Sequence, residues 1–195
     1  RPSTARAPRA EAMRQSSSGH ILALAKGQFN ESARVFRALA LVGACSEETR
    51  IVADAPRQNE AILRLQPGGP DRTIAVTDLT VSGPQFGILL ADPGQVELAA
   101  VAVVDTETNG VFVIGAGTTL RGESVLVRNT QPRQRDSRFG RGIGIEEGGR
   151  VELIRTTLQG NHHHGAFAGG PGTVLTLRDA AIVDTQPQPS DMTRG

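Results

Sequence analysis

The sequence predicts an all-β fold: a right-handed, single-stranded parallel β-helix, that is, a solenoid with about 23 residues per coil. Two features indicate it: a glycine-rich segment that recurs along the chain, and a β-branched stretch after each copy. A third is the absence of any amphipathic helix between the strands, which excludes a βαβ sheet. A propeller blade needs roughly 40 residues, so this shorter repeat fits a coil of short strands, each pairing ~4.8 Å above and below.

The repeat is clearest in the second half of the chain. Four segments begin on a glycine and run into a Gly-rich turn, at Gly87, Gly110, Gly142 and Gly165. Their starts are 23, 32 and 23 residues apart, and the longer step contains an insertion, 131–141. Because Arg194-Gly195 repeats the Arg141-Gly142 pair that opens a unit, we expect the chain to stop at a coil boundary, as a fragment of a longer array.

Two regions are expected. Residues 1–19 hold four Arg, two Pro and a serine run but no strand pattern. They are either a leader or a capping segment in which Ala10–Gln15 forms a short helix over the open end of the solenoid. Residues 20–195 form the β-helix. Its early strands are expected at Ile21–Gly27, Leu39–Gly43, Arg50–Ala53, Ala61–Leu65, Thr73–Val76 and Leu79–Val81.

Composition limits the function. The 195 residues include 21 Lys and Arg against 20 acidic residues, which argues against a nucleic-acid partner. No apolar run approaches the ~20 residues of a membrane helix, so no transmembrane segment is expected. One cysteine cannot form a disulfide framework. The absence of Trp and Tyr removes the usual platforms for stacking on sugars.

Two stretches carry a resemblance to a known family. The string Ile21–Glu31, followed by Leu39–Cys45 and Thr49, resembles the opening turns of pectin-lyase-like right-handed β-helix proteins. The later Gly-Ile-x-Ile and Val-x-Leu units with Asp-Thr endings are similar to the β-helix repeats of secreted and envelope-anchored bacterial proteins. The resemblance covers residues 20–195 and implies the fold and an extracellular or cell-envelope location. It implies no activity, because this fold hosts lyases, hydrolases, tailspikes and adhesins.

In the lyases and hydrolases that the chain resembles, catalytic groups project from one strand stack. The corresponding stack here is the Gly-initiated one, where period-two alternation directs Leu89, Phe112, Gly144 and Phe167 outward. Arg64 is a candidate for the same place one coil earlier, in a register that the sequence leaves ambiguous. The row contains no acid, base or metal ligand. We therefore expect an exposed apolar patch formed by Leu89, Phe112 and Phe167, a feature that often marks a protein contact.

Other polar residues do not form a recognisable catalytic set. Asp105 and Asp184 occupy equivalent corners three coils apart, roughly 14 Å, whereas the carboxyls of glycosidases lie ~5–9.5 Å apart. Both are interpreted as corner residues that bond local backbone. The consecutive histidines 162–164 cannot all face one metal ion, so no metal site is expected.

The inserted loop, 131–141, carries the surplus of charge. It holds four arginines and one acid: Arg133, Arg135, Arg138, Arg141 and Asp136. Arginine forks match carboxylate, sulfate and phosphate groups, and solenoid insertions gather on one face that often binds ligands. The predicted binding residues are these arginines, and the predicted ligand is an anionic glycan or the acidic patch of a partner protein.

Two functions remain open from the sequence. The first is a non-catalytic scaffold or binding segment of a secreted or cell-envelope bacterial protein, with no cofactor. The alternative is a polysaccharide lyase or glycoside hydrolase that acts on an acidic polysaccharide through loop residues. Its catalytic candidates would be Asp105, Arg133, Asp136 and His163, and only this alternative would use Ca²⁺.

Overall fold

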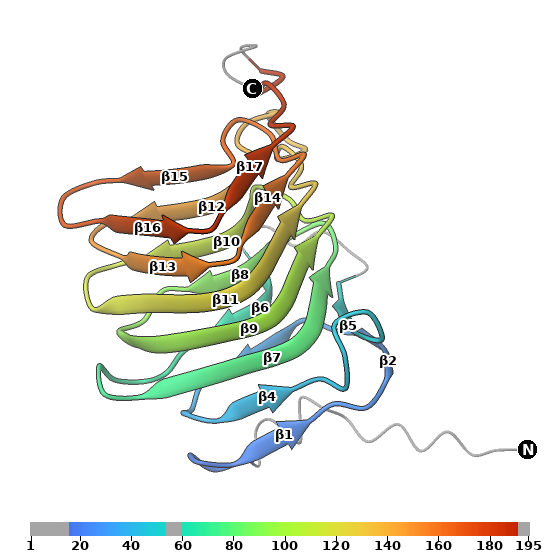
Figure 1. The fold of residues 1–195 in the computed structure, drawn as a ribbon, viewed down its shortest axis with the longest axis vertical. Coiled ribbons are helices and arrows are strands. Elements are labelled where there is room, and N and C mark those ends of the chain that lie inside the picture. Colours follow the sequence, from blue (N-terminus) through green and yellow to red (C-terminus); the bar gives the residue numbers. More distant parts are fainter. Residues whose placement is uncertain (1–15, 54–59, 191–195) are drawn as a thin grey trace, which may run out of the picture.

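The computed structural model describes residues 16–53 and 60–190, which form a right-handed parallel β-helix (Figure 1). The described residues contain strands and no helix, and every pairing between strands is parallel. The predicted fold class is therefore confirmed. The proposed capping helix, Ala10–Gln15, lies outside the described residues. The described part of the chain contains no helix that could cross a membrane.

The strands form two sheets that wrap around one core. Sheet B, the more distant one in Figure 1, has six strands: β3 (Ala33–Val35), β6 (Ala61–Leu65), β8 (Phe86–Leu90), β10 (Asn109–Ile114), β12 (Arg141–Glu146) and β15 (Ala166–Gly169). Sheet A has eleven strands: β1 (Ile21–Ala23), β2 (Gly27–Asn30), β4 (Ala40–Val42), β5 (Thr49–Val52), β7 (Thr73–Ser82), β9 (Gly94–Val104), β11 (Thr118–Arg128), β13 (Arg150–Ile154), β14 (Thr157–Gln159), β16 (Val174–Arg178) and β17 (Ala181–Val183).

The register of sheet B reproduces the predicted repeat. Ile88 pairs with Val111, Val111 with Ile143, and Ile143 with Ala166, so successive coils differ by the predicted 23, 32 and 23 residues. Ile88, Val111 and Ile143 are at most 1% exposed, and they pack against sheet A residues such as Leu120. Stacked aliphatic side chains therefore fill the interior, as the alternation predicts.

The first coils differ from the prediction in detail. The stretch Ile21–Gly27 was expected as one strand, but β1 ends at Ala23 and β2 begins at Gly27. Between them the chain turns, and Leu24 enters the core, where it is 6% exposed. The short strand β3 was not predicted, because three residues are too few to show an alternation.

The sheet A strands bend at one residue in each coil. The bend residues have positive φ angles between 48° and 56°: Asp78, Ala100, Ser124, Arg155 and Asp179. This left-handed conformation costs an L-residue with a Cβ roughly 1–2 kcal/mol. Glycine would occupy it with little strain.

Ala100→Gly should therefore stabilise the protein, by about 0.5–1 kcal/mol. The expected gain is smaller than the full strain, because glycine also adds freedom to the unfolded chain. Urea unfolding measures the difference. Ala102→Gly, two residues along β9 in ordinary strand conformation, is the matched control and should lower stability. A lower midpoint for Ala100→Gly would contradict this account of the bend.

A second corner carries a polar ladder. The chain takes φ angles of 54°, 56°, 61° and 56° at the equivalent positions Asp105, Asn129, Gly160 and Asp184. Asn129 Nδ2 donates a hydrogen bond to Asp105 Oδ1 at 3.1 Å. One residue further, Thr130 N–H donates to Asn161 Oδ1 at 3.0 Å inside the coil. Asp105 thus lies at the predicted corner, but its carboxylate bonds the Asn129 side chain of the next coil rather than local backbone.

Candidate functional site

The outer face of sheet B carries the predicted row, and the row is longer than the sequence could define. Parallel pairing aligns Leu89 with Phe112, Phe112 with Gly144, and Gly144 with Phe167. The same register continues through Arg64 to Arg34. The outward row (Arg34, Arg64, Leu89, Phe112, Gly144 and Phe167) therefore has two arginines at one end and aromatic residues towards the other.

The prediction that Leu89, Phe112 and Phe167 form an exposed apolar patch is wrong. Leu89 is 7% exposed, and both phenylalanines are half-buried. Side chains that lie earlier in each sheet B strand lean over the row. The Phe86 ring lies 5.9 Å from the Phe112 ring, and the Arg141 guanidinium lies 3.8 Å from the Phe167 ring centre. The row is thus a covered surface rather than an open hydrophobic one.

Arg141 holds the inserted loop against the sheet. Only 10% of its side chain is exposed, and its Nη1 donates to Glu146 Oε1 at 2.8 Å. Its guanidinium contacts two rings, that of Phe167 in the row and that of Phe139 in the loop, the latter at 5.1 Å. A cation between two aromatic rings gains cation–π attraction. Arg141 therefore links the loop to the outer face of sheet B.

The loop itself is organised around the carboxylate of Asp136. Arg133 Nε donates to Asp136 Oδ1 at 3.0 Å, and a terminal guanidinium nitrogen of Arg133 contacts the other oxygen. The Arg138 backbone N–H also donates to Oδ1, at 3.2 Å. The hydrogen bond from Arg133 is the main reason that the pKa of Asp136 is lowered. Near the C-terminal end of the loop, the Phe139 backbone N–H donates to Gln188 Oε1 at 2.8 Å.

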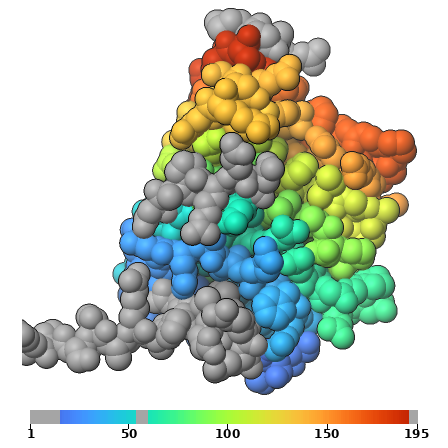
Figure 2. Space-filling model, turned by 180° about the vertical axis from the view of Figure 1, so that it is seen from behind, coloured from blue at the N-terminus to red at the C-terminus, as the bar shows by residue number. Residues whose placement is uncertain are grey.

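The four loop arginines consequently fall into two groups. Arg133 and Arg141 are held by carboxylates, Asp136 and Glu146. Arg135 has 53% of its side chain exposed and lies 3.7 Å from Asp136, and Arg138 is exposed, with a side chain that makes no hydrogen bond or ion pair within the described residues. In Figure 2 the loop, coloured gold, bulges outward near the red C-terminal end. A ligand approaching this face would meet Arg135 and Arg138 first.

The loop should loosen in acid. A carboxylate with a lowered pKa in the folded state contributes stability above its unfolded pKa, near 3.9, and loses that contribution as the pH falls through its folded pKa. The protection factor of the Arg138 amide, that is, its exchange rate relative to the intrinsic rate at the same pH, should therefore fall below about pH 4. In the Asp136→Asn variant, the Arg138 amide should be poorly protected at neutral pH, and its protection should no longer change with pH. A Arg138 amide that stays equally protected from pH 6 to pH 3 would contradict the arrangement.

The rings of His163 and His164 contact each other, with their centres 3.9 Å apart, whereas His162 has a different partner. His162 Nδ1 lies 3.1 Å from Thr130 O, and His163 N–H donates to Gln186 O at 2.8 Å. The His164 ring lies 5.5 Å from the Phe167 ring, so His164 rather than His163 contacts the row. Among the described residues, no three His, Cys, Asp or Glu side chains gather as a metal site.

Three residues near this site were missed from the sequence: Phe139, His164 and Asn109. Asn109 pairs with Arg141 in the β10–β12 register and is 4% exposed. A Cβ added at Gly144 would lie 2.5 Å from its Oδ1, so glycine in the row makes room for it. The repeat in the sequence could have indicated two of them. Each row residue Phe112, Gly144 and Phe167 is preceded, three positions earlier, by a polar residue: Asn109, Arg141 and His164.

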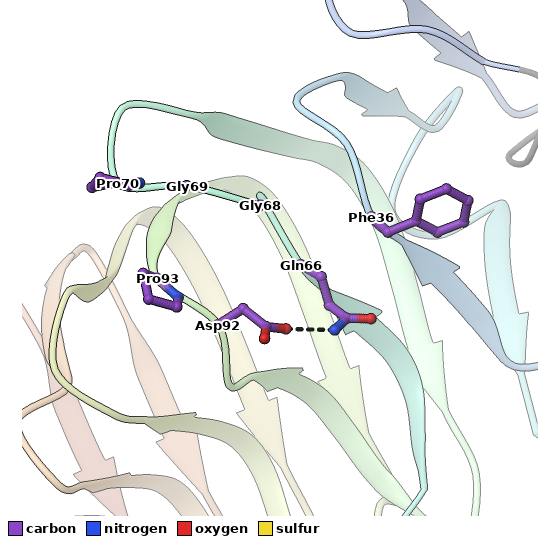
Figure 3. Close-up of a pocket in the computed structure, with 7 residues that line it drawn as sticks. All are labelled: Phe36, Gln66, Gly68, Gly69, Pro70, Asp92 and Pro93. Carbon is purple, nitrogen blue, oxygen red and sulfur yellow. Dashed lines mark hydrogen bonds between the residues drawn. The ribbon is translucent and has the colours of Figure 1, made fainter.

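A separate hollow of about 470 Å³ lies at the corner that follows sheet B (Figure 3). Gln66 and Asp92 point toward each other from adjacent coils, and Gln66 Nε2 donates to Asp92 Oδ2. Phe36 lies on the opposite side of Gln66, and the remaining lining is Gly68, Gly69, Pro70 and Pro93. The two polar groups bond each other, and none of the predicted site residues lies here.

The arrangement on sheet B is suited to binding anions rather than to proton transfer. Of the carboxylates that contact the loop, Asp136 and Glu146 are each engaged by an arginine, and Glu107 accepts from the Gln134 backbone N–H at 3.0 Å. Asp105 is part of the corner ladder with Asn129. A general acid must hold a proton at working pH, and the lowered pKa of Asp136 opposes this.

No protein-family model and no curated protein matches the chain. Among solved structures, it is similar to a pectin methylesterase variant in complex with a hexasaccharide, with 13% sequence identity and a TM-score of 0.46. The match covers 91% of this chain and 75% of that one.

Proposed function

We propose that this chain is a non-catalytic β-helix segment of a secreted or cell-envelope protein, and that it binds an anionic glycan on the outer face of sheet B. One observation carries the proposal: the loop 131–141 is fixed by its own ion pairs so that Arg135 and Arg138 remain exposed. A preorganised loop binds without losing its own conformational freedom, which favours affinity. Carboxylate and sulfate groups match the planar donors of arginine.

The same contacts favour binding over catalysis. Arg133 and Asp136 satisfy each other, so neither is available as an acid or base. The His163 backbone N–H donates to Gln186 O, and Asp105 accepts from Asn129 at a different corner. This proposal assigns no common catalytic point to Asp105, Arg133, Asp136 and His163. Binding in this proposal requires no Ca²⁺.

The test is the double variant Arg135→Gln/Arg138→Gln, with oligogalacturonate as the anionic probe and a neutral dextran oligomer beside it. Each charge-assisted hydrogen bond is worth about 1.5–3 kcal/mol, so the double variant should weaken oligogalacturonate binding about 100-fold or more. Calorimetric titration measures the affinity, which should also fall with added salt.

The matched control is Arg50→Gln/Arg150→Gln, which removes two exposed arginines from sheet A. It changes the net charge equally and should leave the affinity unchanged. Equal losses in both double variants would mean that only overall charge matters, and this would overturn the proposed site. Tight binding of the neutral oligomer would overturn it as well.

A further inference from the structure

The N-terminal end of the outward row holds two arginines that have no partner among residues 16–53 and 60–190. Arg34 and Arg64 are aligned on the neighbouring parallel strands β3 and β6, about 4.8 Å apart along the solenoid. Neither side chain forms a hydrogen bond or ion pair with any residue in the described part of the chain. Two like charges at this spacing repel each other. An anion between them would convert that repulsion into attraction.

A hollow lies at these two side chains. It has a volume of about 170 Å³, room for several water molecules, and its lining is Ser32, Ala33, Arg34, Glu60, Ala61 and Arg64. Arg64 Nε is shielded from solvent and has no hydrogen-bond acceptor. This donor is already desolvated in the free protein, so an oxyanion that reaches it regains a bond without a further desolvation cost.

The charges around the hollow indicate the kind of anion. Arg34 and Arg64 contribute two guanidinium groups to the lining, and their planar N–H donors fit an anion with two or more acceptor oxygens. The hydroxyl of Ser32, which contacts Gln85 Oε1 at 3.2 Å, is a further polar group of the lining. A carboxylate and a sulfate ester both present one charge and several acceptor oxygens to a guanidinium fork.

We propose that Arg34 and Arg64 form a second oxyanion site, which takes one carboxylate or sulfate group of a ligand. It lies three coils, roughly 14 Å, from the Gly144 level where Arg141 anchors the loop. The site does not depend on the function proposed for that loop, because none of its lining residues belongs to the loop 131–141.

The experiment is an NMR titration of the arginine Nε–H signals with acetate, methyl sulfate and inorganic phosphate. Acetate or methyl sulfate should give a saturable shift of the Arg64 signal, and a shift with phosphate alone would overturn the choice of a carboxylate or sulfate group. Arg64→Gln and Arg34→Gln should each lower the affinity about tenfold or more. Arg64→Lys should lower it too, since lysine keeps the charge but lacks the fork.

Two variants keep the test sharp. Arg50→Gln, an exposed arginine on sheet A, should bind as the wild type does. The proposal is overturned if no anion gives a saturable shift or if Arg50→Gln weakens binding as much as Arg64→Gln. Arg135→Gln/Arg138→Gln should leave this titration unchanged, which separates the two sites.

Discussion

Gly142→Ala should destabilise the protein by about 3 kcal/mol, at the upper end of the usual cost of overpacking. A Cβ at this position would lie 2.4 Å from the carbonyl oxygen of Gly165 and 2.8 Å from Asn161 Nδ2. The first contact is with the backbone of the next coil, so it cannot be relieved by a change of side-chain rotamer. The coils would have to separate at the place where the corner ladder joins them.

Gly69→Ala is the matched control for this substitution. A Cβ at Gly69 would meet only the side chain of Arg72, at 3.9 Å. This variant should be neutral or slightly more stable, because alanine restricts the unfolded chain. Thermal and urea unfolding measure both variants. Equal stability of the two would mean that glycine at the start of the sheet B strands is not required by stacking.

Arg141→Ala should lower stability by about 2 kcal/mol and release the loop from the sheet. Breaking a fully buried ion pair costs about 3–5 kcal/mol, and the cost here is smaller because 34% of the Glu146 side chain is exposed. Phe139 and Phe167 lose the cation between them at the same time. Unfolding midpoints measure the loss of stability, and amide exchange at Phe139 measures the release of the loop.

A double variant shows whether the unpaired Glu146 carboxylate causes the loss of stability in Arg141→Ala. Arg141→Ala/Glu146→Ala should be more stable than Arg141→Ala alone, because it removes the carboxylate that the single change leaves unpaired. Arg141→Lys should recover the charge but not the contact with both rings. If the double variant is no more stable than the single one, Arg141 acts through packing alone.

The coil length could be predicted from the sequence because it follows from sterics. At Gly87, Gly110 and Gly142 a Cβ would lie within 2.7 Å of a carbonyl oxygen of the neighbouring coil, so glycine marks the start of β8, β10 and β12. The first coils were harder to align, because the place of these glycines is taken by Ile62, between the paired residues Ala61 and Leu63. This substitution concealed the register that puts Arg64 in the outward row.

The surface of the site could not be predicted in the same way. Alternation gives the direction of a side chain, but not whether a neighbour covers it, as Phe86 covers Phe112. The division of the loop arginines depends on a turn in which Ser137 and Phe139 have φ angles of 55° and 69°. No periodicity in the sequence specifies that turn, so the pairing of Arg133 with Asp136 became visible only in the structure.

The central claim is that the outer face of sheet B binds an acidic glycan without transforming it. The most direct measurement is one titration with methyl-esterified and unesterified oligogalacturonates, followed by mass analysis of the recovered sugars. The account predicts saturable, salt-sensitive binding of the unesterified oligomer, weaker binding of the esterified one, and recovery of both unchanged. Sugars that return shortened, unsaturated or de-esterified, with the change lost in an Asp136→Asn variant, would contradict it.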